Sequence, residues 1–415
     1  MFCQPVIAGQ IIISHTINAF PVSHCPTLRF AFLIFKYFPF GGVQRDMLRM
    51  GRELVRLGNT VDIYTMSWEG ELPETGINTH VLPARGLLNH KRYSNFIRHA
   101  LSEITQARFD LVVGLNRMPG LDAYFAADSC FAERTQKQHG IFYRLSGRYR
   151  WFSACERAVF APSAGCEILL LSAKEKVDFQ HWYATPDARF HLLPPYLSAE
   201  RMALHDKTQM RQHLRQTFGF GEHEYVLLAV GSGFRTKGLD RSIHAVAALP
   251  PDLRRKTRLL VVGQDNPKVF KRLAADLGLQ ERVHISAGRS DIPQLMQGAD
   301  LLIHPARREL AGHVLLEAMA SGLPVLVSDV CGYASHIEQA KAGKLIATPF
   351  RQHELNTDLI EMLMSDMRDE WAANGLKYAQ GIMAANDGSA EAKILLAIAK
   401  SKQQGREESA DDLAL

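Results

Sequence analysis

The stretch FAFLIFKYFPFGGVQRDMLRMGRELVRLG (30–58) joins an apolar run to an amphipathic run through a glycine-containing loop. Residues 30–35 are all apolar, which is typical of a strand that is buried on both faces of a parallel sheet. Residues 43–58 carry apolar side chains at helical spacing, and Gly58 stands where a helix commonly ends. The stretch therefore predicts one strand–loop–helix unit of an α/β fold.

The same alternation recurs along the chain and predicts further strands. They cover 60–66, 110–115 and 167–173 in the first half, and 225–231, 257–263, 283–288, 300–306 and 324–329 in the second. The alternation breaks near 189–202, where Pro194 and Pro195 interrupt a strand, and a helical pattern over 356–382 follows the last strand. We therefore predict two Rossmann-like, doubly wound α/β domains that face each other across a cleft.

The domain boundaries follow from these patterns. We predict a first domain over 28–195 and a second over 196–370, followed by helices over 371–400 that return toward the first domain. Residues 1–27 precede the first convincing strand and are predicted to be a poorly ordered extension. Residues 401–415 are polar and contain too little apolar surface to order themselves, so we predict a disordered tail.

The composition narrows the functional classes. A chain of 415 residues, 47% of them hydrophobic, has ample core for two domains, and a net charge of +5 argues against wholesale coating of nucleic acid. Six cysteines lack the spacing of metal sites, which favours buried thiols in a reducing compartment. No apolar run reaches the ~20 residues of a membrane span, and the N-terminus lacks the pattern of a signal peptide. We therefore expect a soluble, cytoplasmic protein that binds no nucleic acid.

Two strand-to-helix loops are candidates for a phosphate site, because ligands of parallel sheets bind at the carboxyl ends of strands. In the first loop, Gly41 and Gly42 would let a phosphate approach backbone N–H groups, although a plain tight turn explains them equally well. Asp46 follows in the first helical turn, where it could simply complement the helix dipole. In the second loop, Arg235 and Lys237 flank a turn and could pair with a diphosphate, or be solvated surface cations.

A third loop, RRELAGHVLLEAMASGLPVL (307–326), contains two carboxylates separated by seven residues. Glu309 follows a predicted strand, and Glu317 lies about two turns into a predicted helix. The first N–H groups of that helix are free to take a pyrophosphate, whereas carboxylates repel phosphate and suit sugar hydroxyl groups. A nucleotide-sugar is therefore a better candidate ligand than free phosphate.

The run from Glu309 to Glu317 resembles the Glu, seven residues, Glu motif of retaining GT-B glycosyltransferases of family 4. Further motifs are similar to the lipopolysaccharide core glucosyltransferases that act on inner-core heptose: FKYFPFGGVQRD, YTMSWEGE, NRMPGLDAYFAADSCFAE, YRLSGRYRWF, VVGQDNP and SDVCGYASHI. The likeness extends from about Phe30 to about Glu370. It implies a GT-B fold, a UDP-glucose donor, a lipopolysaccharide core heptose as acceptor, an α-(1,3) linkage formed with retention, and no metal or other cofactor.

The resemblance also implies catalytic residues. Glu309 would hold the donor hexose, Asp128 matches a position at the reacting centre and Asp46 matches one near the donor. The usual account of such a retaining transfer is a front-face reaction, in which the departing phosphate takes the proton of the acceptor while cations stabilise its charge.

The donor-binding residues that the resemblance implies lie in the loops described above: Gly41, Gly42, Arg201, Arg235, Lys237, Arg289, Leu310, Ala311, Gly312, His313, Val314 and Glu317. Glu317 would hold the ribose hydroxyls, Lys237 would neutralise the diphosphate and Arg289 would lie by the uracil. The chain departs from the family at one point, because the family's two basic residues beside the diphosphate are adjacent, whereas Thr236 precedes Lys237 here. Either Arg235 reaches in from its own position or the leaving group has one cation fewer.

The segment near 131–155 is basic and aromatic. Five basic residues and no acidic one stand between 134 and 151. At helical spacing an apolar stripe forms with basic margins, which is typical of an interfacial helix on anionic lipid; the stripe is Phe142, Leu145, Tyr149 and Phe152. An ordinary helix that buries this stripe in the first domain is the alternative. We predict contact with the cytoplasmic face of the inner membrane through Arg144, Arg148, Arg150 and Trp151.

Two other functions are compatible with the sequence. A few pocket residues could direct the same fold to another hexose, such as galactose or an N-acetylhexosamine, because size discrimination in a pocket is worth only about 1–3 kcal/mol. A sugar-nucleotide-binding module without turnover is the second alternative. The sequence favours an epimerase or a phosphorylase of the same fold less than either of these alternatives.

Overall fold

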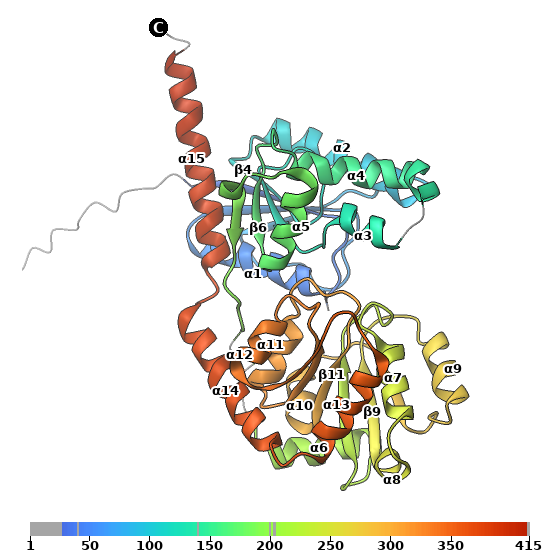
Figure 1. The fold of residues 1–415 in the computed structure, drawn as a ribbon. Coiled ribbons are helices and arrows are strands. Elements are labelled where there is room, and N and C mark those ends of the chain that lie inside the picture. Colours follow the sequence, from blue (N-terminus) through green and yellow to red (C-terminus); the bar gives the residue numbers. More distant parts are fainter. Residues whose placement is uncertain (1–26, 40, 139–140, 199–200, 202–204, 413–415) are drawn as a thin grey trace, which may run out of the picture.

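The computed structural model describes residues 27–39, 41–138, 141–198, 201 and 205–412. The chain forms two α/β domains, each built on one parallel sheet with helices packed on it (Figure 1). This confirms the predicted fold class. The predicted extension over 1–27 lies outside the described residues except for Thr27.

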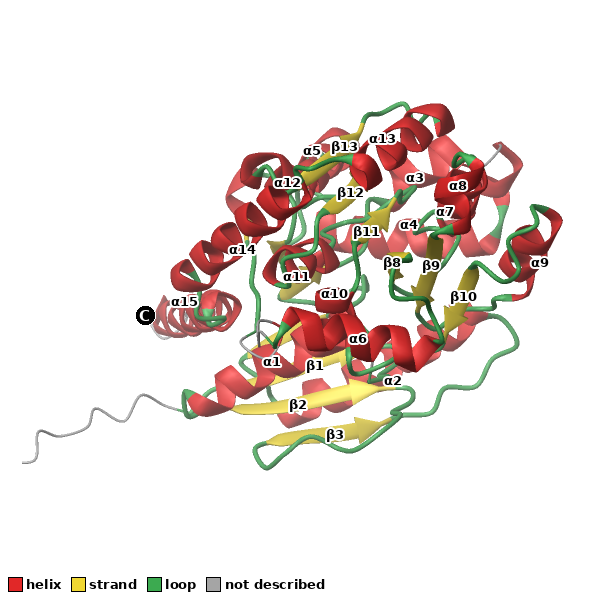
Figure 2. Ribbon diagram, turned by 90° about the horizontal axis from the view of Figure 1, so that it is seen from below, coloured by secondary structure: helices red, strands yellow, loops and turns green. Residues whose placement is uncertain are grey.

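The first domain contains a sheet of seven strands. They are β1 (Arg29–Ile34), β2 (Thr60–Thr65), β3 (Ile77–Val81), β4 (Leu111–Gly114), β5 (Ala123–Ala126), β6 (Glu167–Leu170) and β7 (Phe190–Leu192). Their order is β3-β2-β1-β4-β5-β6-β7, and every pairing is parallel. Figure 2 shows β1, β2 and β3 side by side at one end of this sheet.

The second domain contains a sheet of six strands. They are β8 (Tyr225–Val230), β9 (Thr257–Val262), β10 (Val283–Ser286), β11 (Leu301–His304), β12 (Val325–Ser328) and β13 (Gly343–Ile346). Their order is β10-β9-β8-β11-β12-β13, again with parallel pairings.

Helices connect these strands. In the first domain they are α1 (Gly42–Arg56), α2 (Asn89–Ala107), α3 (Phe131–Gln138), α4 (Gly147–Phe160) and α5 (Ala173–Tyr183), with 3-10 turns η1 (Ile141–Leu145) and η2 (Asp187–Arg189). In the second they are α6 (Lys207–Phe218), α7 (Leu239–Ala247), α8 (Pro251–Arg255), α9 (Lys268–Asp276), α10 (Ile292–Gly298), α11 (His313–Ala320), α12 (Ala334–Ala340) and α13 (Gln352–Met364). The chain ends with α14 (Arg368–Ala385) and α15 (Ala390–Asp412).

Each sheet reverses its winding at one place. In the first sheet, β2 and then β3 lie on one side of β1, and the chain then returns to place β4 on the other side of β1. In the second sheet, β9 and β10 lie on one side of β8, and β11 lies on the other. Doubly wound sheets bind ligands outside the carboxyl ends of the strands at such switch points. The loops that follow β1, β8 and β11 are therefore the expected binding loops, and they contain the three motifs singled out in the sequence.

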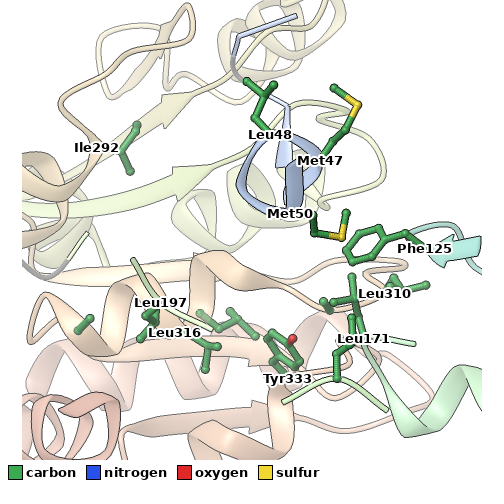
Figure 3. Close-up of a cluster of buried hydrophobic side chains, with 14 of the residues drawn as sticks. Met47, Leu48, Met50, Phe125, Leu171, Leu197, Ile292, Leu310, Leu316 and Tyr333 are labelled. Atoms are coloured by element: carbon green, nitrogen blue, oxygen red, sulfur yellow. The ribbon is translucent and has the colours of Figure 1, made fainter. Parts of the chain in front are cut away.

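One continuous hydrophobic cluster joins the two domains (Figure 3). Met47 and Met50 of α1 belong to the same cluster as Leu310 and Tyr333 of the second domain. The amphipathic pattern of α1 thus serves two purposes, because it buries one face on its own sheet and also packs toward the cleft. This packing fixes the position of the loop that precedes α1.

Four predictions about elements need correction. The helical pattern over 356–382 is two helices, α13 and α14, which are separated by residues 365–367. The tail predicted to be disordered after 400 continues α15 to Asp412, because its Lys, Gln, Glu, Arg and Ala residues are good helix formers. Three short strands, β3, β5 and β13, were not predicted, whereas β7 is the strand that Pro194 and Pro195 interrupt. The segment near 131–155 is not one continuous helix, as described below.

Candidate active site

A cavity of about 790 Å³ lies between the domains. Loops that follow β1 and β5 line it from the first domain, and loops that follow β8, β9, β10 and β11 line it from the second. The structure brings together nearly all of the predicted catalytic and donor-binding residues in its lining: Gly41, Gly42, Asp46, Asp128, Arg201, Lys237, Arg289, Glu309, Leu310, Ala311, Gly312, His313, Val314 and Glu317. Arg235 is the exception.

The glycine pair opens the start of α1 to the cavity. Gly42 is the first residue of α1, and a Cβ atom there would meet nothing within 4 Å. A Cβ atom on Gly41 would meet Oε1 of Gln44 at 1.8 Å, and the Gln44 amide donates a 3.0 Å hydrogen bond to the carbonyl of Lys36. Gln44 therefore braces the loop, while Gly42 leaves room for a phosphate beside the helix N-terminus.

The start of α11 faces the same space from the second domain. Gly312 is the N-cap residue, with a φ of 95° that favours glycine, and no side chain caps this helix start. A helix start without a side-chain cap leaves first-turn N–H groups available to an anion. Leu310, Ala311, His313 and Val314 complete this part of the cavity lining.

Glu309 is held by two partners. Lys237 forms an ion pair with its Oε2 atom, and Nε2 of His304 lies 3.3 Å from the same atom. Burial by itself would raise the pKa of Glu309, but the hydrogen bond with His304 and the charge of Lys237 outweigh it and lower the pKa to about 2. Glu309 is therefore a carboxylate at neutral pH, able to accept hydrogen bonds from hydroxyl groups but not to donate a proton.

Glu317 lies between two arginines. Nη1 of Arg45, on α1, is 3.5 Å from Oε1 of Glu317, and Nη1 of Arg201 is 3.7 Å from Oε2. Arg45 and Glu317 come from opposite sides of the cavity, so this contact spans the two domains. The Glu317 carboxylate can accept hydrogen bonds from hydroxyl groups, and the two arginines beside it can pair with a phosphate.

Two other predicted donor residues differ in their surroundings. Arg289 lines the cavity, and its guanidinium forms a two-point pair with Asp291, at 2.7 and 2.6 Å. Arg235 is exposed and is not part of the cavity lining. Its neighbour Phe234 is buried in the core, which directs the next side chain of this turn outward. In this conformation Lys237 therefore faces the cavity without Arg235.

The two aspartates reach the cavity from the first domain. Asp46 lies one turn into α1, and its Oδ1 is 3.5 Å from Nη2 of Arg49. Asp128 follows β5, its side chain is about half exposed, and its Oδ2 is 4.0 Å from Nη2 of Arg117. Asp128 is thus the more accessible of these two carboxylates.

Sequence reasoning missed two residues of this site. Arg45 lies in the first helical turn beside Asp46, and its contact with Glu317 has no local signal because the partners are far apart in the chain. His304 is the last residue of β11, where a polar residue that ends a buried strand could have marked it. No group of three or more His, Cys, Asp or Glu side chains that could hold a metal occurs among the described residues.

The predicted membrane segment is a 3-10 turn followed by a helix. Ser146 separates η1 from α4, and its hydroxyl accepts a 3.1 Å hydrogen bond from the N–H of Tyr149 as an N-cap. The predicted stripe is therefore divided, because Phe142 and Leu145 on η1 are exposed while Tyr149 and Phe152 on α4 are half-buried. In the part of the chain that is described, no helix has the length and apolarity to cross a bilayer.

Of the residues predicted to meet the membrane, the three arginines are exposed and the tryptophan is only partly exposed. Arg144, Arg148 and Arg150 all face solvent. Trp151 is half-buried and packs against Tyr93 of α2, with ring centroids 5.9 Å apart.

The prediction that the cysteines are buried thiols is confirmed for four of them, which are free and buried: Cys130, Cys155, Cys166 and Cys331.

Comparisons with known proteins match both domains. A model of the group 1 glycosyl transferases matches residues 210–378, and a model of glycosyltransferase family 4 matches residues 40–201. The chain is 45% identical over 350 residues to the lipopolysaccharide glucosyltransferase WaaG of Escherichia coli K12, which covers 84% of this chain and 93% of that protein. It is 26% identical to a D-inositol 3-phosphate glycosyltransferase of Stackebrandtia nassauensis, over 82% of this chain and 83% of the other.

Solved structures agree with these matches. The crystal structure of WaaG, described as a glycosyltransferase involved in lipopolysaccharide biosynthesis, superposes with a TM-score of 0.84 at 42% identity and covers 88% of this chain and 99% of its own. Anabaena HepE in complex with UDP-glucose superposes with a TM-score of 0.67 at 17% identity, over 92% of this chain and 100% of that one. The second likeness concerns the fold alone.

Proposed function

Because the chain belongs to the glycosyltransferase family that includes the lipopolysaccharide glucosyltransferase WaaG, we propose that it transfers glucose from UDP-glucose to an inner-core heptose of lipopolysaccharide. The linkage proposed is α-(1,3), with retention of the anomeric configuration. The observation that carries the proposal is the arrangement of Lys237, Glu309 and Glu317 around the start of α11 in a single cavity. A cation and two hydroxyl acceptors beside a free helix N-terminus suit a sugar diphosphate.

The donor is proposed to bind in three parts. Its diphosphate lies between the starts of α1 and α11, where Gly42 leaves space and Lys237 supplies charge. Its ribose hydroxyls hydrogen bond to Glu317, and its hexose hydroxyls hydrogen bond to Glu309. The carboxylate state of Glu309, with a pKa lowered to about 2, makes it a hydrogen-bond acceptor throughout the physiological range.

The reaction proposed is a front-face displacement. The bond between the glucose C1 atom and the β-phosphate oxygen breaks, and a bond from C1 to the acceptor hydroxyl oxygen forms on the same face. The departing phosphate oxygen receives the proton of that hydroxyl. Lys237, with Arg45 and Arg201 beside Glu317, stabilises the negative charge of the departing UDP, while Asp128 faces the acceptor.

These cations also support a reaction without a divalent metal. A metal in such reactions balances the charge of the diphosphate, and here basic side chains line the cavity for that purpose. We expect transfer to continue at an unchanged rate after treatment with EDTA. A loss of activity that Mg²⁺ or Mn²⁺ restores would contradict this part of the proposal.

The proposed acceptor is a membrane-anchored glycolipid, so the enzyme is proposed to work at the cytoplasmic face of the inner membrane. The exposed arginines at the start of α4 support contact with anionic lipid, each worth about 1 kcal/mol near such a surface. Co-sedimentation with anionic vesicles tests this contact. The triple change Arg144→Ser, Arg148→Ser and Arg150→Ser should weaken it, and unaltered binding would refute the proposed contact.

The activity itself is tested by release of UDP from UDP-glucose in the presence of heptose-terminated core oligosaccharide. Release above background supports the transferase, and parallel assays with UDP-galactose and UDP-N-acetylglucosamine test the choice of hexose. Binding of UDP without release would identify a module that does not turn over. Mass spectrometry of the product then shows whether one hexose was added.

Variants separate the two carboxylates. Glu309→Ala should abolish transfer and leave the affinity for UDP nearly intact, because Glu309 is proposed to contact only the sugar. Glu317→Ala should weaken UDP binding itself. Isothermal titration with UDP measures both affinities, and an equal loss of transfer and UDP binding in Glu309→Ala would show that its assigned role is wrong.

A further inference from the structure

Several large apolar side chains of the first domain are strongly exposed, and four of them lie in two short segments. Leu87 is 103% exposed, Phe142 is 82%, Leu145 is 73% and Leu88 is 52%. Phe142 and Leu145 belong to η1, in the segment already proposed to meet the membrane. Leu87 and Leu88 belong to a different segment, the turn that leads into α2, with Leu88 as its N-cap residue.

The structure brings these two segments together. A Cβ atom on Gly147, the first residue of α4, would lie 3.8 Å from Nε2 of His90 in the first turn of α2. Tyr93 of α2 packs against Trp151 and Phe152 of α4, with ring centroids 5.9 and 6.5 Å apart. Figure 1 shows α2 and α4 at the same end of the first domain. The two turns therefore border one surface.

Both segments are basic and free of acidic residues. No Asp or Glu occurs from 75 to 102, and this stretch contains four basic side chains, Arg85, Lys91, Arg92 and Arg98. None occurs from 134 to 155 either. Arg85, Lys91 and Arg98 are exposed, as are the arginines at the start of α4. Apolar tips within a basic, acid-free rim match the charge and polarity of an anionic bilayer interface.

This surface lies beside the cavity. Tyr93, five residues after Leu88 on α2, is part of the cavity lining and stacks on Phe35 at a centroid distance of 4.1 Å. Five residues of a helix span about 7.5 Å, so Leu88 and the cavity edge are separated by less than about one turn and a half. A bilayer that contacts Leu88 would hold a lipid-anchored acceptor near the side of the cavity that contains Asp128.

We propose that Leu87 and Leu88 form a second lipid-docking segment, which inserts into the same anionic bilayer as η1 and the start of α4. The inference rests on the membrane contact proposed above and adds to it a hydrophobic anchor from another part of the chain. Two separate anchors fix the orientation of the enzyme on the bilayer, which a single helix does not, and so direct the cavity toward the acceptor.

The test uses the full chain and phosphatidylcholine vesicles that contain about one-third phosphatidylglycerol, an anionic lipid. The variant is Leu87→Ser with Leu88→Ser, which changes exposed side chains outside the cavity lining. The matched control is Val269→Ser with Met364→Ser, since these side chains of the second domain are 70% and 67% exposed. Co-sedimentation measures binding, and UDP release with soluble core oligosaccharide monitors the fold.

The expected result is at least about tenfold weaker binding of the leucine variant to anionic vesicles, because two apolar side chains that would enter the bilayer are replaced by polar ones. The control should bind like the wild type, and UDP release should be unchanged in both variants. If the arginine triple variant loses binding while the leucine variant keeps it, this inference is wrong and the proposed membrane contact stands. If the wild type itself does not bind, both fail.

One further outcome also overturns the inference. If size-exclusion chromatography shows that the wild type is a dimer and that the leucine variant is a monomer, the exposed leucines contact a second copy of the chain and not lipid. Salt dependence gives an independent readout, because binding that depends on both anchors should weaken at high salt without disappearing.

Discussion

Glu309 illustrates how neighbours determine the state of a carboxylate. Its ordinary pKa of 4.5 falls to about 2 in the folded protein, so the folded state favours the ionised form. A lowered pKa contributes stability that is fully present above about pH 4.5 and is lost as the pH falls toward 2. The difference corresponds to roughly 3 kcal/mol, at about 1.36 kcal/mol for each pH unit.

We therefore predict that Glu309→Gln destabilises the protein at pH 7 by about 3 kcal/mol, and that the difference from the wild type shrinks as the pH falls below 4.5. Urea unfolding at pH 7 and at about pH 3, between the two pKa values, measures it. A difference that stays constant across this range would show that Lys237 and His304 do not hold Glu309 in its ionised form.

Arg45 and Arg235 offer a direct comparison of structure with sequence. The sequence left open whether Arg235 supplies a second cation for the diphosphate or that cation is missing, whereas in the structure Arg45 contacts Glu317 and Arg235 lies outside the cavity lining. We predict that Arg45→Ala weakens UDP binding about tenfold, the loss of one charge-assisted contact, and that Arg235→Ala changes it less than about twofold. Isothermal titration distinguishes them, and the reverse order would mean that Arg235 moves into the cavity when UDP binds.

Local spacing explains which site residues could be predicted. The glycine pair and the two glutamates belong to strand–loop–helix units, in which one short stretch of sequence shows the strand, the loop and the start of the helix. Contacts across the cavity, such as Arg45 with Glu317, depend on how two domains meet. No periodicity within either partner's segment indicates such a contact.

At the scale of elements, the strands that were missed are the weak ones. Strands β3 and β13 lie at sheet edges, where one side is open and polar residues enter the pattern. Buried central strands such as β1 and β8 were found because both faces require apolar side chains. Likewise, the break between η1 and α4 depends on a single capping residue, Ser146, within an otherwise helical pattern.

Helix α4 also connects its exposed arginines to Asp128 at the cavity through Glu156. This fully buried carboxylate accepts hydrogen bonds from the N–H groups of Phe131, at 2.6 Å, and Ala132, at 2.9 Å, and from the hydroxyl of Tyr183 at 2.6 Å. It also pairs with Arg117, which lies 4.0 Å from Asp128. Glu156 thus holds the start of α3 and the arginine that faces Asp128.

We predict that Glu156→Ala lowers the free energy of unfolding by about 3–5 kcal/mol, because it leaves Arg117 buried without its partner. Urea unfolding measures this effect. In protein that remains folded, kcat should fall while the affinity for UDP stays near that of the wild type, since Glu156 contacts none of the residues proposed to bind UDP. Weaker UDP binding with normal kcat would contradict the assigned connection to Asp128.

On the scale of the whole molecule, α15 returns to the first domain after α14 has packed on α11 of the second. Arg49 of α1 lies at this crossing. Its guanidinium donates two hydrogen bonds to Glu391, at 2.5 and 2.9 Å, and one of 2.7 Å to the carbonyl of Gly388. It also stacks on Tyr196 of the segment between the domains, 4.4 Å from the ring centroid. One side chain therefore joins the first domain, the connecting segment and the C-terminal helix.

Removing Glu391 should affect both stability and donor binding. We predict that Glu391→Ala lowers the free energy of unfolding by about 3 kcal/mol, because largely buried Arg49 is left with only the 3.5 Å contact to Asp46 as an ion pair. Since α1 also positions Gly42 and Arg45 at the cavity, the affinity for UDP should fall as well.

Lys402→Ala provides the matched control on the same helix, because the pair of Lys402 with Asp122 is more exposed and should contribute less than about 1 kcal/mol. Urea unfolding and titration with UDP measure both variants. If Glu391→Ala resembles Lys402→Ala in both measurements, the contact of α15 with the first domain does not position α1. The hydrophobic cluster between the domains would then fix the position of α1.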